Sequence, residues 1–208
     1  MEMSFNLLRM IQILLKAAPS VVEEENLTNS FGDTPLHIAV KNKNLDVMKL
    51  LLTESPPLLK QKMLETCNKE DCTPLHMAVS VRNNDEIIEL LIANGANVNH
   101  QNIHGNTPLH SAAQKSNSDE ARILLNNGAV IDMPNRDRET SLHMAVVSGY
   151  FGTIEMVALL LDKGADINVM DKNHKTPLML AVTGSYAYAI VPLLKERSIP
   201  TDTGCCQD

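Results

Sequence analysis

Four histidines recur at nearly regular intervals along the 208-residue chain, and histidine is the side chain best suited to bind a metal or transfer a proton near neutral pH. They are His37, His76, His110 and His143, separated by 39, 34 and 33 residues (76 − 37, 110 − 76, 143 − 110). Intervals near 33 residues are typical of stacked repeats, whose helical layers lie about 8–10 Å apart. A metal binds a histidine nitrogen at about 2.0–2.1 Å, so adjacent histidines are too widely spaced to share an ion. We predict that each histidine instead binds turn backbone near a helix start.

The cysteines could support nucleophilic or redox chemistry. Cys67 and Cys72 flank a predicted turn, and Cys205 and Cys206 lie near the end of the chain. Because the chain is not small and has no disulfide framework, we expect reduced thiols, with a Cys67–Cys72 bridge as the alternative.

Sequence motifs for catalysis are absent. The chain has no phosphate-binding loop ending Gly-Lys-Ser/Thr, no Gly-x-Ser-x-Gly, no His-Glu-x-x-His and no Cys-x-x-Cys. Carboxylate runs such as residues 23–25 are typical of solvated faces. We predict a protein that is not an enzyme and has no cofactor, catalytic residue or metal site.

The elements that carry the histidines are predicted to be helices. In Thr73-Pro74-Leu75-His76, threonine can cap a helix and proline fits its first position. Leu75 and Ala78 then lie three residues apart on one helical face. A second apolar run over residues 87–92 follows and ends at Gly95, which suits a left-handed C-terminal cap. Each repeat is therefore predicted to consist of a first helix, a short turn, a second helix and a long polar turn.

Each long turn needs a backbone with positive φ two residues before the next threonine. Gly32 and Gly105 provide it freely, and Asp71 and His174 tolerate it. Arg138 is the residue least suited to this position. We expect a slightly altered turn there.

The helix-starting segment occurs five times, and its continuation is specific. The threonines are Thr34, Thr73, Thr107, Thr140 and Thr176. Four copies continue to His-x-Ala, which completes Thr-Pro-Leu-His-x-Ala with a serine in place of proline in the copy at Thr140, and this pattern is the signature of ankyrin repeats. The chain resembles an ankyrin-repeat protein. That resemblance implies an all-α solenoid of stacked helix-turn-helix units with long β-hairpin-like turns.

The resemblance also divides the chain. We expect five repeats over residues 29–200, beginning near residues 29, 68, 102, 135 and 171. Residues 1–28 are predicted to form an N-terminal capping helix and a connecting turn. The apolar run at residues 7–15 lacks the basic start of a secretory signal, is interrupted by Arg9 and is too short to span a membrane. Residues 201–208 are predicted to be a flexible tail, and Pro192 predicts a kinked or degraded last helix.

Two repeats are longer than 33 residues. The first is longer by six (73 − 34 = 39), around Pro56-Pro57, which should end the second helix and extend the outgoing loop. The fourth is longer by three (176 − 140 = 36), at residues 149–153. With its lengthened first repeat, the chain also resembles the ankyrin domains of IκB proteins and NF-κB precursors, which likewise have a long first repeat. The Asp-Ser-Gly-x-x-Ser degradation signal of that group is absent here, so such a relative would lack signal-triggered destruction.

The resemblance implies partner binding through turn tips and the exposed side of the first helices, which together form a concave face. The corresponding tip residues are Phe31, Asp33, Lys69, Glu70, Ile103, His104, Asn106, Arg136, Arg138, Glu139, Lys172 and Lys175. The corresponding first-helix residues are Lys41, Ser80, Gln114, Lys115 and Val147. Phe31 and Ile103 either anchor a partner or pack on the neighbouring turn. The cations of the last two turns suit an acidic patch on the partner.

Composition narrows the class of partner. The formal net charge is −7 and aromatic residues make up 3% of the chain, which argues against nucleic acid as a ligand. We predict a folded protein partner, a monomer when unbound, no membrane span, and a cytoplasmic or nuclear location. The IκB-like version is an inhibitor of Rel/NF-κB transcription factors. The alternative is a microbial or viral effector or adaptor that recruits a host protein through the same surface.

Overall fold

A computed structural model describes residues 28–198 apart from residue 185. Residues 1–27 of the predicted capping segment and the predicted tail with Cys205 and Cys206 lie outside the described residues. Within the described part, the regular elements are eleven α-helices and no strand, so the all-α prediction is confirmed.

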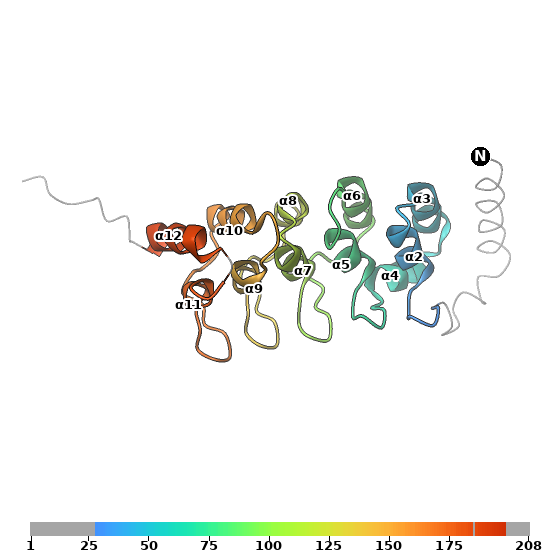
Figure 1. The fold of residues 1–208 in the computed structure, drawn as a ribbon. Coiled ribbons are helices and arrows are strands. Elements are labelled where there is room, and N and C mark those ends of the chain that lie inside the picture. Colours follow the sequence, from blue (N-terminus) through green and yellow to red (C-terminus); the bar gives the residue numbers. More distant parts are fainter. Residues whose placement is uncertain (1–27, 185, 199–208) are drawn as a thin grey trace, which may run out of the picture.

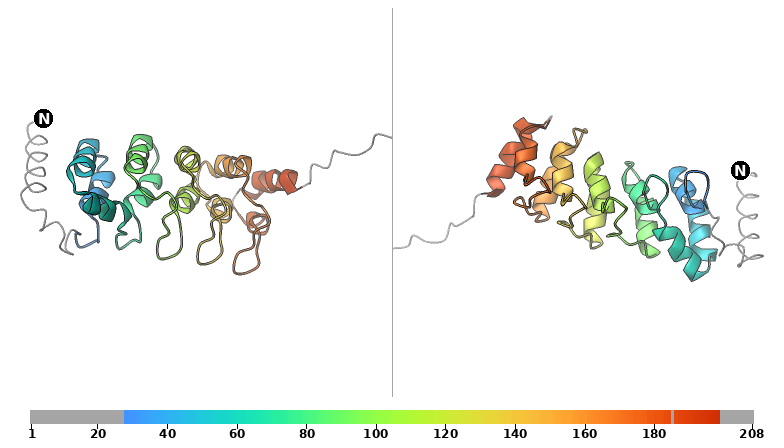
Figure 2. Two further views of the ribbon diagram at one scale, coloured as in Figure 1. Left: turned by 180° about the vertical axis from the view of Figure 1, so that it is seen from behind. Right: turned by 90° about the horizontal axis from the view of Figure 1, so that it is seen from below.

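The helices form two parallel rows along an elongated stack (Figure 1). The inner row consists of α2 (Pro35–Lys41), α5 (Pro74–Val79), α7 (Pro108–Lys115), α9 (Ser141–Val147) and α11 (Pro177–Ala181). The outer row consists of α3 (Leu45–Glu54), α6 (Asp85–Ala93), α8 (Ser118–Asn126), α10 (Thr153–Asp162) and α12 (Ala187–Ser198). Each inner helix packs on the next one, and the long turns project from one side of the stack (Figure 2).

The inner helices begin where the threonines predict. The Thr73 hydroxyl accepts the backbone N–H of His76 at 3.3 Å, and Pro74 occupies the first helical position. Thr34 and Thr107 cap α2 and α7 in the same way. These caps satisfy N–H groups that a helix start otherwise leaves without partners.

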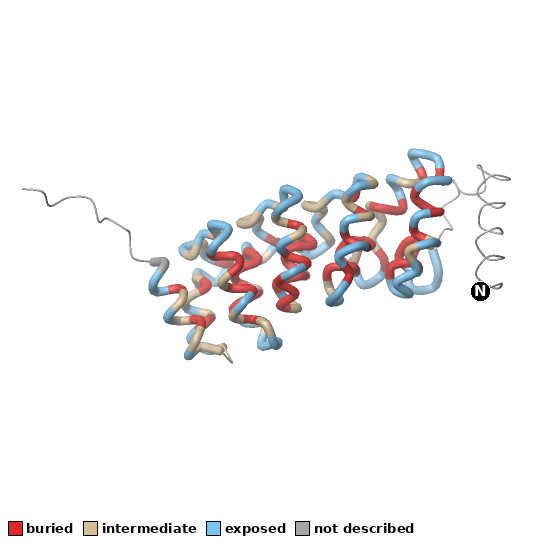
Figure 3. Tube along the Cα trace, turned by 90° about the horizontal axis from the view of Figure 1, so that it is seen from above, coloured by how far each residue is buried: buried red, intermediate tan, exposed pale blue. Residues whose placement is uncertain are grey.

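The core lies between successive layers and follows the predicted inward face. Leu75 and Ala78 are 1% and 0% exposed, and Leu109 and Ala112 are both 0% exposed. Figure 3 shows these buried stretches recurring from one layer to the next along the tube. A small alanine at this position lets neighbouring helices approach closely, which is how units without a core of their own stabilise one another.

The extra residues of the first repeat form a helix, so the predicted extended loop is wrong. α3 ends at Glu54, as Pro56 and Pro57 predict, but α4 (Pro57–Glu65) then starts with Pro57 at its first position. Proline is well suited to that position because its missing N–H would have no helical partner. Leu59, Met63 and Leu64 bury one side of α4 against α2 and α5.

Pro192 lies inside α12, which continues past it to Ser198. The last helix is therefore not interrupted at Pro192, and the other expected outcome, a kink, stays a prediction. Proline removes one backbone donor from the helix interior. Ile190 and Leu194, on either side of Pro192, are both 0% exposed, so packing against the rest of the stack stabilises this helix.

Candidate partner-binding surface

The long turns, which we call fingers, comprise residues 29–34, 68–73, 102–107, 135–140 and 171–176, numbered one to five. Each begins with an asparagine or aspartate whose side chain organises the turn. In finger four, Asn135 Oδ1 accepts the backbone N–H groups of Asp137 and Glu139, both at 2.9 Å. Fingers one, two, three and five use Asn29, Asn68, Asn102 and Asp171 in the same way.

Sequence reasoning missed these five turn-forming residues. The signal was present, because each one stands five residues before a helix-capping threonine, and short Asn and Asp side chains commonly bond backbone N–H groups two residues on. In Asp171, burial would raise the pKa, but the N–H groups of Lys175 and Asn173 stabilise the carboxylate and hold its pKa below the usual value.

The turn at Arg138 is not altered, contrary to expectation. Arg138 has φ 60°, and its N–H bonds to the Asn135 carbonyl at 2.9 Å. The glycine at the equivalent place in finger three, Gly105, has φ 77° and makes the same bond to Asn102 at 2.8 Å. The asparagine-centred hydrogen bonds hold both turns in the same conformation, although arginine is strained at positive φ.

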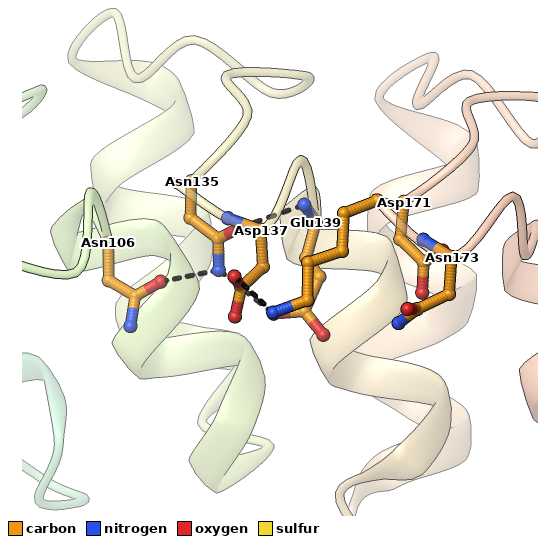
Figure 4. Close-up of polar contacts among 7 residues, drawn as sticks. Asn106, Asn135, Asp137, Glu139, Asp171 and Asn173 are labelled. Atoms are coloured by element: carbon orange, nitrogen blue, oxygen red, sulfur yellow. Dashed lines mark hydrogen bonds and ion pairs between the residues drawn. The ribbon is translucent and has the colours of Figure 1, made fainter.

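Neighbouring fingers are joined to one another. The backbone N–H of Arg136 donates to the His104 carbonyl at 3.0 Å, and that of Lys172 donates to the Asp137 carbonyl at 2.8 Å. Asn135 Nδ2 also donates to Asn106 Oδ1 at 2.9 Å (Figure 4). The fingers therefore form one connected surface rather than five independent loops.

Ion pairs also cross between fingers. Lys172 Nζ lies 2.7 Å from Asp137 Oδ1, and this hydrogen bond raises the pKa of Lys172. His104 Nε2 lies 3.5 Å from Asp71 Oδ2. Both contacts are partly or largely exposed, so each contributes little to stability, but each holds its side chains in place between two fingers.

The repeat histidines have the predicted structural role and an additional one. His76 Nδ1 accepts the Thr73 N–H at 3.3 Å, so Nδ1 is unprotonated and Nε2–H donates to the Asn106 carbonyl of the next finger at 3.0 Å. His37, His110 and His143 make the equivalent pair of contacts. Burial lowers the pKa of His76 to about 4, although the bond to Asn106 opposes this shift.

The described cysteines show no sign of activation. Cys67 and Cys72 are free thiols, so the alternative of a bridge between them is not observed. Burial and the nearby Glu70 carboxylate raise the pKa of Cys72 to about 11, which is opposite to the shift that a nucleophilic thiolate needs. Residues 28–198, without residue 185, contain no group of three or more His, Cys, Asp or Glu placed to hold a metal.

Most predicted contact residues are accessible. On the fingers, the exposed residues are Phe31, Lys69, Glu70, Ile103, His104, Arg136, Arg138, Lys172 and Lys175. On the inner helices, Lys41, Gln114 and Val147 are exposed, and Ser80 and Lys115 are half-buried. Phe31 and Ile103 remain 66% and 53% exposed, which favours their availability to a partner over packing on the next turn.

Three predicted contact residues make hydrogen bonds within the stack. Asp33 is 5% exposed and accepts a hydrogen bond from Asn68 Nδ2 at 2.7 Å, so it is not an exposed tip residue. Asn106 and Glu139 are half-buried, and both accept hydrogen bonds from Asn135 Nδ2. They join or shape fingers, a role that the sequence pattern alone did not reveal, and contact of Asn106 and Glu139 with a partner stays a prediction.

None of the helices formed by the described residues is long and apolar enough to cross a membrane.

Comparison with known proteins agrees with this geometry. Family models described as ankyrin repeats match residues 3–102 and 80–171 (three copies) and residues 149–194 (many copies). The nuclear factor NF-kappa-B p105 subunit of Gallus gallus is 30% identical over 141 residues, which cover 66% of this chain and 14% of that protein. NF-kappa-B inhibitor alpha of Sus scrofa is 32% identical over 160 residues, covering 72% and 49%.

An ankyrin repeat protein of fowlpox virus, FPV031, is 33% identical over 123 residues, covering 59% of this chain and 34% of that protein. The chain thus corresponds to half or less of the length of each of these relatives. The family models together match more than half of the chain, in agreement with the stacked helix pairs and the capped Thr-Pro starts. The chain therefore belongs to the ankyrin-repeat family.

Proposed function

We propose that this ankyrin stack binds a folded protein partner through its fingers and the exposed side of its inner helices, as an IκB-like inhibitor of Rel/NF-κB transcription factors. Ankyrin repeats form protein–protein interaction modules, and the fold is generally non-enzymatic. The observation that carries the proposal is the connected finger surface, which keeps Phe31 and Ile103 exposed on turns held by hydrogen bonds. Such preorganisation lowers the ordering cost of binding.

The positive charges on fingers four and five support the same binding surface and indicate the chemistry of its partner. Fingers four and five expose Arg136, Arg138, Lys172 and Lys175, with Lys172 held by Asp137. An acidic patch on the partner would complement these side chains and speed association. A cytoplasmic or nuclear location follows from the proposed Rel-type partner.

The Rel/NF-κB assignment is supported by two relatives whose names refer to that system, the p105 subunit and inhibitor alpha. The first repeat is also lengthened, and its extra residues form α4. A long first repeat supports the same Rel/NF-κB assignment. The alternative is a viral or microbial adaptor that recruits a host protein through the same fingers, and the fowlpox relative is the observation that favours it.

A competition experiment tests the inhibitor proposal. A fluorescent DNA duplex carrying the target site of a Rel-type dimer is bound to that dimer, and this protein is added while anisotropy is recorded. An inhibitor lowers the anisotropy at protein concentrations comparable to the dimer. If the DNA stays bound while surface plasmon resonance shows no dimer binding, the Rel assignment fails and the adaptor alternative takes its place.

A further inference from the structure

A second feature of the exposed surface lies away from the fingers, where inner helices connect to outer helices. The connecting loops, residues 42–44, 80–84, 116–117, 148–152 and 182–184, contain no aspartate or glutamate, although the chain carries a net charge of −7. The charges at this edge are Lys43 and Arg82, with Lys41 and Lys115 at the ends of α2 and α7. Carboxylates begin in the first turns of the outer helices, where the helix dipole favours negative charge.

The three extra residues of the fourth repeat place two aromatic side chains at this edge. Tyr150 and Phe151 are 48% and 86% exposed, and Phe151 is the most exposed large apolar side chain among the described residues. Gly149 and Gly152, with φ 64° and 95°, close the loop around them. An isolated exposed apolar residue needs no explanation, but Phe151 belongs to a loop that is held by hydrogen bonds from another repeat.

Arg82, from the second repeat, braces the loop. Its Nη2 donates to the Phe151 carbonyl at 2.6 Å and to the Ser116 carbonyl at 2.9 Å, which ties repeats two, three and four together. A Cβ at Gly152 would lie 2.7 Å from Arg82 Nη2, so this contact depends on glycine. Thr153 Oγ1 also donates to the Tyr150 carbonyl at 2.7 Å. Phe151 is therefore displayed on a fixed backbone.

A cationic side chain contacts Tyr150, and exposed valines stand next to Arg82 and three residues before Tyr150 in the sequence. Lys115 Nζ lies 3.4 Å from the Tyr150 hydroxyl and 5.2 Å from its ring centroid. Val81 and Val147 are 50% and 53% exposed. We define the aromatic–cation patch as Val81, Arg82, Lys115, Val147, Tyr150 and Phe151.

We propose that the aromatic–cation patch binds an acidic peptide segment of the partner protein, with an apolar side chain covering Phe151 and carboxylates facing Arg82 and Lys115. This inference rests on the proposed binding function. It extends the predicted inner-helix contacts Lys115 and Val147 into the adjoining loops and gives that part of the surface a defined chemistry. An exposed aromatic side chain on a held backbone is an effective anchor, because little backbone freedom is lost when the ring is covered. Cations in loops that carry no carboxylate select for acidic sequences.

Single-stranded nucleic acid could also stack on Tyr150 and Phe151. A protein ligand is favoured because the patch holds two cations and the whole chain is acidic, whereas phosphate binding depends on neutralising many phosphates at once.

Peptide selection tests the inference even while the natural partner is unidentified. An unbiased phage library of 12-residue peptides is selected on the full chain, and the enriched peptides are measured by fluorescence anisotropy. We expect enriched sequences that combine Asp or Glu with Leu, Phe or Trp. Phe151→Ala and Lys115→Glu should each weaken binding of these peptides at least tenfold. Val130→Ala, which truncates a 47% exposed valine in the loop after α8, is the matched control and should bind like the wild type.

Other outcomes overturn the inference and separate it from the proposed function. If the enriched peptides lack acidic residues, or if both patch variants bind the peptides with unchanged affinity, the patch is not a docking site. If Ile103→Asp on finger three abolishes peptide binding while the patch variants do not, the finger surface stands alone and the inference fails. If a twelve-residue oligo-dT displaces the peptides at lower concentration than an unlabelled copy of the same peptide, the patch binds nucleic acid instead. Thermal unfolding of each variant confirms that its fold is retained.

Discussion

At the scale of single residues, the repeat histidine connects local and long-range structure. Its unprotonated Nδ1 accepts the N–H of its own capping threonine, and its Nε2–H donates to a carbonyl of the next finger, 29 to 35 residues away in the sequence. The Nδ1 bond needs the neutral ring, because a protonated Nδ1 would face the threonine N–H with a hydrogen of its own, whereas Nε2–H can donate in either protonation state. Each histidine is therefore both a helix cap and a link between repeats.

This arrangement predicts acid lability. The pKa of His76 is lowered to about 4 from a usual value of 6.5, and burial also lowers the pKa values of His37 and His110. Between the usual pKa and the lowered pKa of His76, the unfolded chain binds more protons than the native one. The contribution of this residue to the free energy of unfolding is therefore full above about pH 6.5 and is lost as the pH falls towards 4. His76 alone accounts for up to about 3 kcal/mol. Urea unfolding from pH 7.5 to 4.5 measures this loss.

A variant pair checks that the buried ring is responsible. His76→Gln should be less stable than the wild type at pH 7.5 and should show a shallower decline in acid. His174→Asn changes an exposed histidine with φ 58°, a conformation that asparagine tolerates, and should keep the wild-type slope. Equal slopes in all three proteins would contradict the assignment.

At the scale of elements, the inserted helix α4 is the main departure from the sequence-based expectation. Pro56 and Pro57 end α3 but also start α4, whose buried side consists of Leu59, Met63 and Leu64. Double proline marks a break in one helix and does not reveal that a packing surface lies beyond it. The helix is stabilised by contact with α2 and α5, which no local pattern encodes.

Packing of α4 is tested by truncating side chains on its two sides. Met63→Ala removes a side chain that is 3% exposed and should lower the free energy of unfolding by about 2–4 kcal/mol. Leu58→Ala, in the same helix at 74% exposure, should change it by less than about 0.5 kcal/mol. Equal, small effects in urea melts would mean that residues 57–65 form the loop expected from the sequence.

The same distinction between local and long-range information explains what else the sequence could predict. Thr73-Pro74 and the Leu75/Ala78 pair specify a capped helix and its inward face within a few residues, and those predictions are confirmed. The burial of Asp33 by finger two depends on Asn68, 35 residues later. Arg82 reaches Phe151 across 69 residues. Such contacts exist only once the repeats have stacked.

At the scale of the whole molecule, the last repeat shows what stacking does to each layer. The sixth residue after the capping threonine is buried in the first four repeats, where Val40, Val79, Ala113 and Val146 are 0–3% exposed. Its equivalent in the fifth repeat, Val182, is 62% exposed. Met179 replaces the repeat histidine there and is 57% exposed, because no further repeat follows among the described residues to cover it.

A matched pair of substitutions tests this end of the stack. Val146→Asp would bury an unpaired carboxylate between repeats four and five and should cost about 3 kcal/mol or more. Val182→Asp, at the equivalent position of repeat five, should leave the urea midpoint nearly unchanged. Strong destabilisation by Val182→Asp would show that another part of the chain covers the end of the stack.

Partner binding by the fingers is the central proposal for the whole molecule, and the most direct test is the binding kinetics of finger variants. Surface plasmon resonance would compare the wild type, Ile103→Asp, the double variant Arg136→Glu/Arg138→Glu and the control Val130→Asp against a Rel-type dimer. We predict that the double variant associates more slowly with a changed salt dependence, that Ile103→Asp dissociates at least tenfold faster, and that the control matches the wild type. Wild-type kinetics in both finger variants, on a dimer that does bind, would contradict the proposal.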